Sequence, residues 1–112
     1  MVTLTHHDVV EEFRHLVNIK RGELEIWLQS PESKSVGQHA RAGDESVGHR
    51  SGRRIVGLLQ RNQFDDDDIE HMRTVIGFIH RHLAQRPRGD VRDTAWRFSL
   101  MNWGHDPLLD RH

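Results

Sequence analysis

Hydrophobic residues recur at alternating spacings of three and four between Asp66 and Arg86, the clearest period in the chain. The stripe consists of Ile69, Met72, Ile76, Ile79 and Leu83, widened by Val75 and Phe78. This spacing places the residues on one face of an α-helix. The acidic run Asp65 to Asp68 lies at the start of the segment and Pro87 follows it, as expected at helix boundaries. We therefore predict a long helix from Asp66 to Arg86, against which the other segments pack.

Two shorter helices are predicted before this one. Thr5 and Asp8 have the spacing of a capping box at the start of a first helix that ends near Asn18. After a short turn, a second helix is closed by Pro31. Its apolar side consists of Leu24, Trp27 and Leu28.

A third helix is predicted from His49 to Asn62, with either Ser46 or Ser51 as its N-cap. Its core-facing residues are Val56 and Leu59, with Ile55 and Leu58 as further candidates.

A last helix begins near Asp93 or Thr94, after the predicted long helix. Its apolar face consists of Trp96, Leu100 and Trp103, and Gly104 has the position of a C-terminal glycine.

Ser33 to Gly48 is rich in serine, glycine and small polar residues, which predicts a mobile loop. No segment alternates as a strand does. The expected fold is therefore all-α: one domain over residues 1–112, with about five helices packed around the long helix.

Composition excludes several classes of protein. No apolar run approaches the roughly 18 residues that span a bilayer, and the N-terminus lacks the blocks of a signal peptide. Without cysteine there is no disulfide or thiolate site. These features favour a cytoplasmic protein with no membrane partner.

The formal net charge is only −1, but the charges are segregated along the chain. Four arginines and no acid lie between His49 and Phe64, five acids between Asp65 and Glu70, and six arginines against two aspartates between His71 and Arg97. A near-neutral chain can thus carry a basic face. Arginine suits planar, bidentate partners such as phosphate.

Arg50, Arg54 and Arg61 share one face of the predicted third helix, with Gly57 on the same line and Arg53 at its border. Nothing projects at a glycine, so a phosphate backbone can approach such a face closely. The alternative is a solvated face, or arginines paired with the Asp65 to Asp68 run. A second basic group surrounds the Pro87 turn and includes Arg81, Arg86 and Arg88.

The ten histidines have no metal-site spacing: there is no HExxH motif and no pair four residues apart on a predicted helix. We expect neither a metal nor a cofactor. Ser51 lacks the motif of a nucleophile elbow, and His105-Asp106 fits a turn that ties down the C-terminal segment. We expect no enzyme, since catalysis would require a pocket that gathers His49, Ser51 or His105.

Several strings carry a family resemblance: ESKSVG at Glu32 to Gly37, ESVGHRSGRRIV at Glu45 to Val56, HRHLAQRP at His80 to Pro87 and WRFSLMNWGHDP at Trp96 to Pro107. With the FRHLVN and LEIWL strings before them, they resemble the small bacterial family DUF3140 from about Val9 to Pro107. The resemblance implies one coherent domain, and some members of the family are labelled DNA-binding. Where relatives tend to begin the second helix with Ser-Pro, this chain has Lys20-Arg21, so the cap of that helix differs.

We therefore predict a helical protein that binds nucleic acid, chiefly DNA, through arginine contacts to phosphates with weak sequence specificity. The predicted contacts are Arg50, Arg53, Arg54 and Arg61, with Arg81, Arg86 and Arg88 as a second group. The alternative is a helical module that binds another protein or itself as a homodimer.

Overall fold

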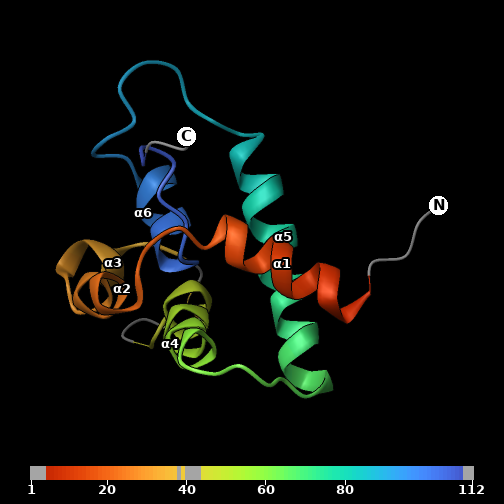
Figure 1. Cartoon of the computed structure of the whole chain (residues 1–112). Helices are drawn as coiled ribbons and strands as arrows, with labels where there is room; N and C mark the ends of the chain where they lie inside the picture. The colour runs from red at the N-terminus through yellow and green to blue at the C-terminus, as the bar shows by residue number, and fades with distance from the viewer. Residues whose placement is uncertain (1–4, 38, 40–43, 110–112) are drawn as a thin grey trace.

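The computed structural model describes residues 5–37, 39 and 44–109 of the chain. Within these residues the protein is all-helical and has no strand, which confirms the predicted fold class. The helices found there are α1 (His6–Leu16), α2 (Arg21–Leu28), α3 (Pro31–Ser35), α4 (Val47–Leu59), α5 (Asp66–Leu83) and α6 (Ala95–Asn102) (Figure 1).

Capping boxes begin both α1 and α5. The Asp8 N–H donates to Thr5 Oγ1 over 3.1 Å, and the Thr5 N–H donates to the Asp8 carboxylate over 3.3 Å. Asp65 and Asp68 repeat this exchange at the start of α5, over 2.8 and 3.1 Å. Each box satisfies two N–H groups that a helix start would otherwise leave unpaired. The predicted capping box at Thr5 is confirmed.

α5 is the longest helix and ends at Leu83, three residues before the predicted end at Arg86. Its 18 residues make it about 27 Å long. Val75 is completely buried, whereas Ile76, placed by the pattern in the central stripe, is only partly buried. The stripe is therefore rotated by about one residue from the predicted one.

The prediction for Pro31 is wrong. The pattern places Pro31 at the end of the second helix, but α2 ends at Leu28 and Pro31 is the first residue of α3. Proline is tolerated there because the first N–H of a helix has no partner within the helix. Ser30 caps this helix by accepting a hydrogen bond from the Ser33 N–H over 3.1 Å.

The predicted loop from Ser33 to Gly48 is shorter than expected, because α3 includes its first residues and α4 its last. Residues 38 and 40–43 of that loop lie outside the described residues, so its mobility stays a prediction.

α4 begins two residues before the predicted His49, and Ser46 is its N-cap. The Ser46 hydroxyl accepts a hydrogen bond from the His49 N–H over 3.0 Å. Ser51, the other candidate cap, is buried within the helix.

The core-facing side of α4 also differs from the predicted one. Ile55 and Leu58 are buried, while Val56 and Leu59 are only partly buried. The small residues Gly48, Ser51 and Gly52 share the buried face. Hydrophobic periodicity does not detect such small residues, and this explains the error in phase.

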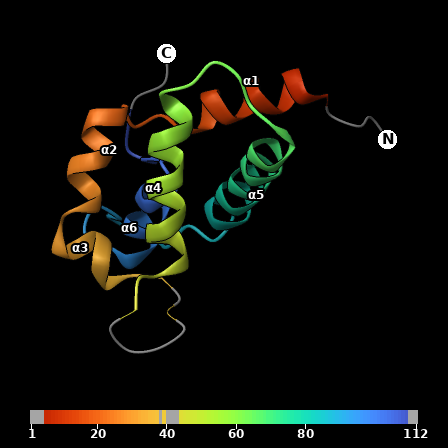
Figure 2. The same ribbon diagram turned by 90° about the horizontal axis from the view of Figure 1, so that it is seen from below.

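The helices form two pairs that α6 joins. α1 packs on α5, and α2 packs on α4. In Figure 1, α6 lies above α4, with α2 and α3 on one side and α5 on the other; it contacts all four of these helices. Figure 2 shows α2 and α4 side by side in the view from below. α6 is thus a second centre of packing beside the long helix α5.

Gly52 allows α4 to approach α6 closely. A Cβ atom at Gly52 would lie 2.5 Å from the backbone oxygen of Asn102 and 2.7 Å from Leu28 Cδ2. A Cβ atom at Gly57, on the exposed side of α4, would meet no atom within 4 Å. The contact between α4 and α6 therefore requires glycine at position 52, while position 57 has room for a side chain.

The C-terminal part agrees with the prediction. Thr94 caps α6, and Trp96, Leu100 and Trp103 are all buried. Gly104 follows with φ = +84°, a left-handed conformation that favours glycine after a helix.

Candidate functional site

The primary predicted contacts, Arg50, Arg53, Arg54 and Arg61, form what we call the α4 arginine cluster. All four side chains are exposed, and they follow α4 from its first turns to the residue after its C-cap. The predicted arginine face thus exists on the surface. Its carboxylate partners decide what it can bind.

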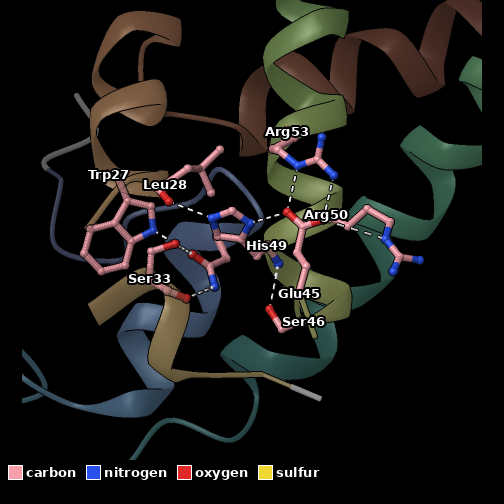
Figure 3. Close-up of polar contacts among 9 residues, drawn as sticks. Trp27, Leu28, Ser33, Glu45, Ser46, His49, Arg50 and Arg53 are labelled. Carbon is pink, nitrogen blue, oxygen red and sulfur yellow. Dashed lines mark hydrogen bonds and ion pairs between the residues drawn. The ribbon is translucent and has the colours of Figure 1, made fainter. Parts of the chain in front are cut away.

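Glu45 lies just before α4 and contacts two arginines of the cluster (Figure 3). Arg53 donates to it in a bidentate arrangement, from Nε over 2.7 Å and from Nη2 over 2.6 Å. Arg50 Nε lies 3.9 Å from the same carboxylate. Chiefly the hydrogen bonds from Arg53, reinforced by His49 and opposed by burial, lower the pKa of Glu45 from 4.5 to about 2. Glu45 is therefore ionised at neutral pH and holds these arginines at the start of α4.

His49 connects this carboxylate to α2. One ring nitrogen, Nδ1, contacts the Glu45 carboxylate, and the other, Nε2, lies 2.6 Å from the Leu28 carbonyl oxygen (Figure 3). The two ring nitrogens of His49 thus contact one group that precedes α4 and one at the end of α2. His49 therefore links the start of α4 to α2.

The other two arginines of the cluster contact the first turn of α5. Arg61 lies 2.9 Å and Arg54 3.5 Å from the Asp68 carboxylate, and Arg54 also donates to the Asp67 carbonyl over 3.1 Å. Chiefly the hydrogen bond from Arg61 lowers the pKa of Asp68. Every arginine of the α4 arginine cluster therefore already has a carboxylate within ion-pair distance.

The second predicted group behaves differently. Arg81, Arg86 and Arg88, which we call the α5 basic end, are exposed, and no carboxylate of the described residues lies within ion-pair distance of them. The Arg86 guanidinium lies over the Trp96 ring, 5.4 Å from its centroid, a distance at which a cation is attracted to the ring face.

Two further arginines of the Pro87 turn are paired. Arg97 makes a bidentate contact with Asp106 over 2.9 and 3.1 Å, and Arg92 lies 3.9 Å from Asp90.

Two arginines of the α4 arginine cluster, Arg54 and Arg61, lie far from the α5 basic end. Arg54 and Arg61 lie at the N-terminal turn of α5, and the α5 basic end lies at the opposite end of this helix. The 13 residues from Asp68 to Arg81 correspond to about 20 Å along the helix axis.

A cavity of about 550 Å³ lies beside the α5 basic end. It is enclosed by the first turn of α4, the last turns of α5, and α6. Its α5 side consists of Thr74, Phe78, Arg81 and His82 on one helix face, with Gln85 just after the helix. Their spacing is visible in the sequence. Their position opposite the start of α4 depends on tertiary packing, for which the sequence contains no local signal.

One wall of this cavity is a stack of rings. The Phe78 ring lies 4.3 Å from the Trp103 ring and 5.0 Å from the His82 ring, centroid to centroid. Burial lowers the pKa of His82, opposed by its hydrogen bond to the Trp96 carbonyl, so the ring is neutral near pH 7.

Asn102 is a completely buried polar residue that joins three helices. Its side-chain oxygen accepts hydrogen bonds from Trp27 Nε1 over 2.8 Å and from Ser33 Oγ over 2.5 Å, and its amide group donates to the Ser33 carbonyl over 3.0 Å. The sequence does not reveal the role of this residue, because an asparagine within an apolar helix has no distinctive spacing.

The candidate catalytic residues are not gathered in one pocket. His49 contacts Glu45 and Leu28, and His105 Nδ1 lies 2.7 Å from the Leu16 carbonyl. Ser51 instead lies 3.1 Å from His71 Nε2. Its side chain is only 4% exposed, so a substrate has little access to it.

His105 and Asp106 tie the C-terminal segment to the N-terminal half of the chain, as the turn hypothesis predicted. Asp106 N–H donates to Asn18 Oδ1 over 2.7 Å, and the Asn18 side chain donates back to the Asp106 carbonyl over 3.0 Å.

Across residues 5–37, 39 and 44–109, no group of three metal-ligating side chains is placed to hold a metal ion. In the same part of the chain, no helix is both long and apolar enough to cross a membrane.

A family model described as "Protein of unknown function (DUF3140)" matches residues 12–101, most of the chain. No curated protein and no solved structure matches this chain. Lys20 is the N-cap of α2 and makes no side-chain capping hydrogen bond.

Proposed function

Since this chain belongs to the DUF3140 family, for which no function is known, we propose from its own surface that it binds nucleic acid, chiefly duplex DNA, through phosphate contacts. The observation that carries this proposal is the α5 basic end, where Arg81, Arg86 and Arg88 are exposed and have no carboxylate partner among the described residues. An arginine without a carboxylate partner can bind a phosphate without first breaking an ion pair.

The α4 arginine cluster is the secondary contact in this proposal. Glu45 is shared between Arg50 and Arg53, and Asp68 between Arg54 and Arg61, so each pair keeps an excess of positive charge. A phosphate at this surface would still have to compete with a bound carboxylate. We therefore expect this cluster to contribute less to affinity than the α5 basic end.

Contacts of this kind are made to the backbone of the nucleic acid, not to the bases. Binding is therefore weakly sequence-specific and falls steeply as salt is added, because counterions are released when phosphates are neutralised. A nucleic-acid partner and a chain without cysteine also fit a cytoplasmic location, which is part of the proposal.

The test is fluorescence anisotropy of a labelled duplex titrated with the protein at low salt. The double variant Arg86→Gln with Arg88→Gln removes two charges from the α5 basic end. We expect it to weaken binding at least about tenfold, since hydrogen bonds to charged groups contribute roughly 1.5–3 kcal/mol each.

The matched control is Arg14→Gln with Arg21→Gln, which changes the net charge equally on α1 and α2. Equal losses in the two double variants would mean that net charge alone drives binding and would contradict the proposed surface. A folded protein without binding at low salt would reject nucleic acid as the partner.

The alternative function is a helical module that binds another protein or itself. The observation in its favour is a set of exposed large hydrophobic side chains: Ile26 at 73%, Val47 at 53%, and Leu108 and Leu109. They lie on three separate segments, α2, the start of α4 and the chain after α6, so a single large apolar patch does not follow from them.

A further inference from the structure

Among the described residues, the cavity between α4, α5 and α6 is lined by a cationic side chain and by no carboxylate. Arg81 is among its lining residues, and none of them is an aspartate or glutamate. The Arg81 side chain lies back along α5, with Nη1 about 3.0 Å from the position that a Cβ of Gly77 would occupy. The glycine thus leaves room for the guanidinium at this wall.

The first turn of α4 adds backbone donors on the opposite wall. The Ser46 hydroxyl accepts a hydrogen bond from the His49 N–H, and the Ser46 carbonyl accepts one from the Arg50 N–H. The preceding N–H groups, of Val47 and Gly48, have no hydrogen-bond partner among the described residues. Both residues line the cavity, and the positive end of the dipole of a 13-residue helix lies there.

A buried side chain supplies an independent donor. Trp27 Nε1 donates to Asn102 over 2.8 Å and Trp96 Nε1 to the His82 carbonyl over 2.7 Å. Trp103 is only 6% exposed, yet its Nε1–H has no partner among the described residues. No fully buried side-chain nitrogen or oxygen in that part of the chain lacks a partner, so Trp103 Nε1 must reach accessible space. Trp103 lines this cavity.

Gly48 brings the two sets of donors together. A Cβ atom at position 48 would lie 2.9 Å from Trp103 Nε1, so only glycine lets the indole N–H lie this close to the first turn of α4. The indole nitrogen and the first turn of α4 thus lie side by side in the cavity that Arg81 also lines. A bound ligand with an acceptor at this place would pair these donors in place of water.

We propose that this cavity binds a small organic oxyanion, a carboxylate or a phosphate monoester attached to an apolar body. Arg81, the first N–H groups of α4 and Trp103 Nε1 bind the oxyanion, and Phe78 with the exposed side chain of Val47 contacts the apolar body. A volume of about 550 Å³ suits a ligand of metabolite size. This site goes beyond the proposed nucleic-acid contact and shares only Arg81 with it.

The three indole N–H groups provide the test, because each gives its own peak in a ¹H–¹⁵N spectrum of the full chain. The probes are phenyl phosphate and benzoate, with benzyl alcohol as a neutral molecule of similar shape. We expect both anions to shift the Trp103 indole peak saturably and to leave those of Trp27 and Trp96 in place. Trp103→Phe assigns the peak.

Two exposed arginines provide a matched pair of variants. Arg81→Gln removes the cation that lines the cavity and should weaken phenyl phosphate binding by about tenfold or more. Arg86→Gln removes a neighbouring cation that does not line it and should leave the affinity nearly unchanged. Gly48→Ala, which places a methyl group beside the indole N–H, should abolish the shift.

Three results would overturn the proposal: no saturable shift of the Trp103 peak at millimolar anion, an equal shift with benzyl alcohol, or unchanged affinity in Arg81→Gln. The outcome is separable from that of the nucleic-acid proposal. Arg86→Gln with Arg88→Gln should weaken duplex binding while phenyl phosphate still binds, so failure of either interaction leaves the other standing.

Discussion

Replacing either of two glycines of α4 by alanine should change the stability of the protein, in opposite directions at the two positions. Gly52 faces α6 and Gly57 faces solvent, and both lie inside the same helix. Gly52→Ala and Gly57→Ala therefore remove the same helix-weakening residue and differ only in what the new methyl group meets. This pair tests the close packing of α4 on α6, on which both the buried Asn102 network and the cavity depend.

The magnitudes follow from the space at each position. Alanine is favoured over glycine in a helix by about 1 kcal/mol, and Gly57→Ala should gain most of it, because no atom lies within 4 Å of the new Cβ. At Gly52 the Cβ would lie 2.5 Å from the Asn102 backbone oxygen, which cannot rotate away. Overpacking of this kind costs roughly 3 kcal/mol, so the net loss should be about 2 kcal/mol.

The assay is urea unfolding followed by circular dichroism at 222 nm, with thermal unfolding alongside. We expect the unfolding midpoint to rise for Gly57→Ala, with Tm higher by roughly 4 °C, and to fall for Gly52→Ala, with Tm lower by roughly 8 °C. Unchanged m-values would show that stability, and not the unfolded state, has changed. A Gly52→Ala protein as stable as the wild type would refute the close contact between α4 and α6.

Two further predictions concern the polar contacts. The folded-state pKa of Glu45 is about 2, below its usual 4.5, so its contribution to stability is complete above about pH 4.5 and is lost as the pH falls towards 2. Glu45→Gln should make the fall in the free energy of unfolding shallower in that window, measured by urea unfolding at several pH values; an identical pH profile would contradict this. Asn102→Ala leaves Trp27 and Ser33 without partners and should cost roughly 3 kcal/mol, whereas Asn62→Ala on the surface should change stability by less than about 0.5 kcal/mol. Equal stability of these two variants would contradict the assigned role of Asn102.

Local signals in the sequence predicted helix boundaries correctly where a residue type has a single structural role at such a boundary. The Thr5–Asp8 capping box and the glycine at position 104 were both found where predicted. The prediction for Pro31 was wrong because proline is found both after the end of a helix and at its start. Here the capping by Ser30 shows that Pro31 begins a helix. The predicted core face of α4 was shifted from the observed one. Gly48 and Gly52 belong to the buried face, but they have no side chain that a hydrophobic pattern could detect.

The candidate site was less predictable, because its properties depend on partners far apart in the sequence. The α4 arginines were correctly placed on one exposed face, but their pairing with Glu45 and Asp68 required the positions of the preceding loop and of α5. Likewise, nothing near Trp103 in the sequence shows that its indole N–H meets the first turn of α4.

The most direct test of the proposed function is the salt dependence of duplex binding, measured as the slope of log K against log salt. Each phosphate contact contributes about 0.9 to this slope. We predict that Arg86→Gln with Arg88→Gln reduces the slope by about 1.8, while Arg14→Gln with Arg21→Gln leaves it unchanged. A slope that is the same in the wild type and in the Arg86, Arg88 variant would show that the α5 basic end does not contact phosphates.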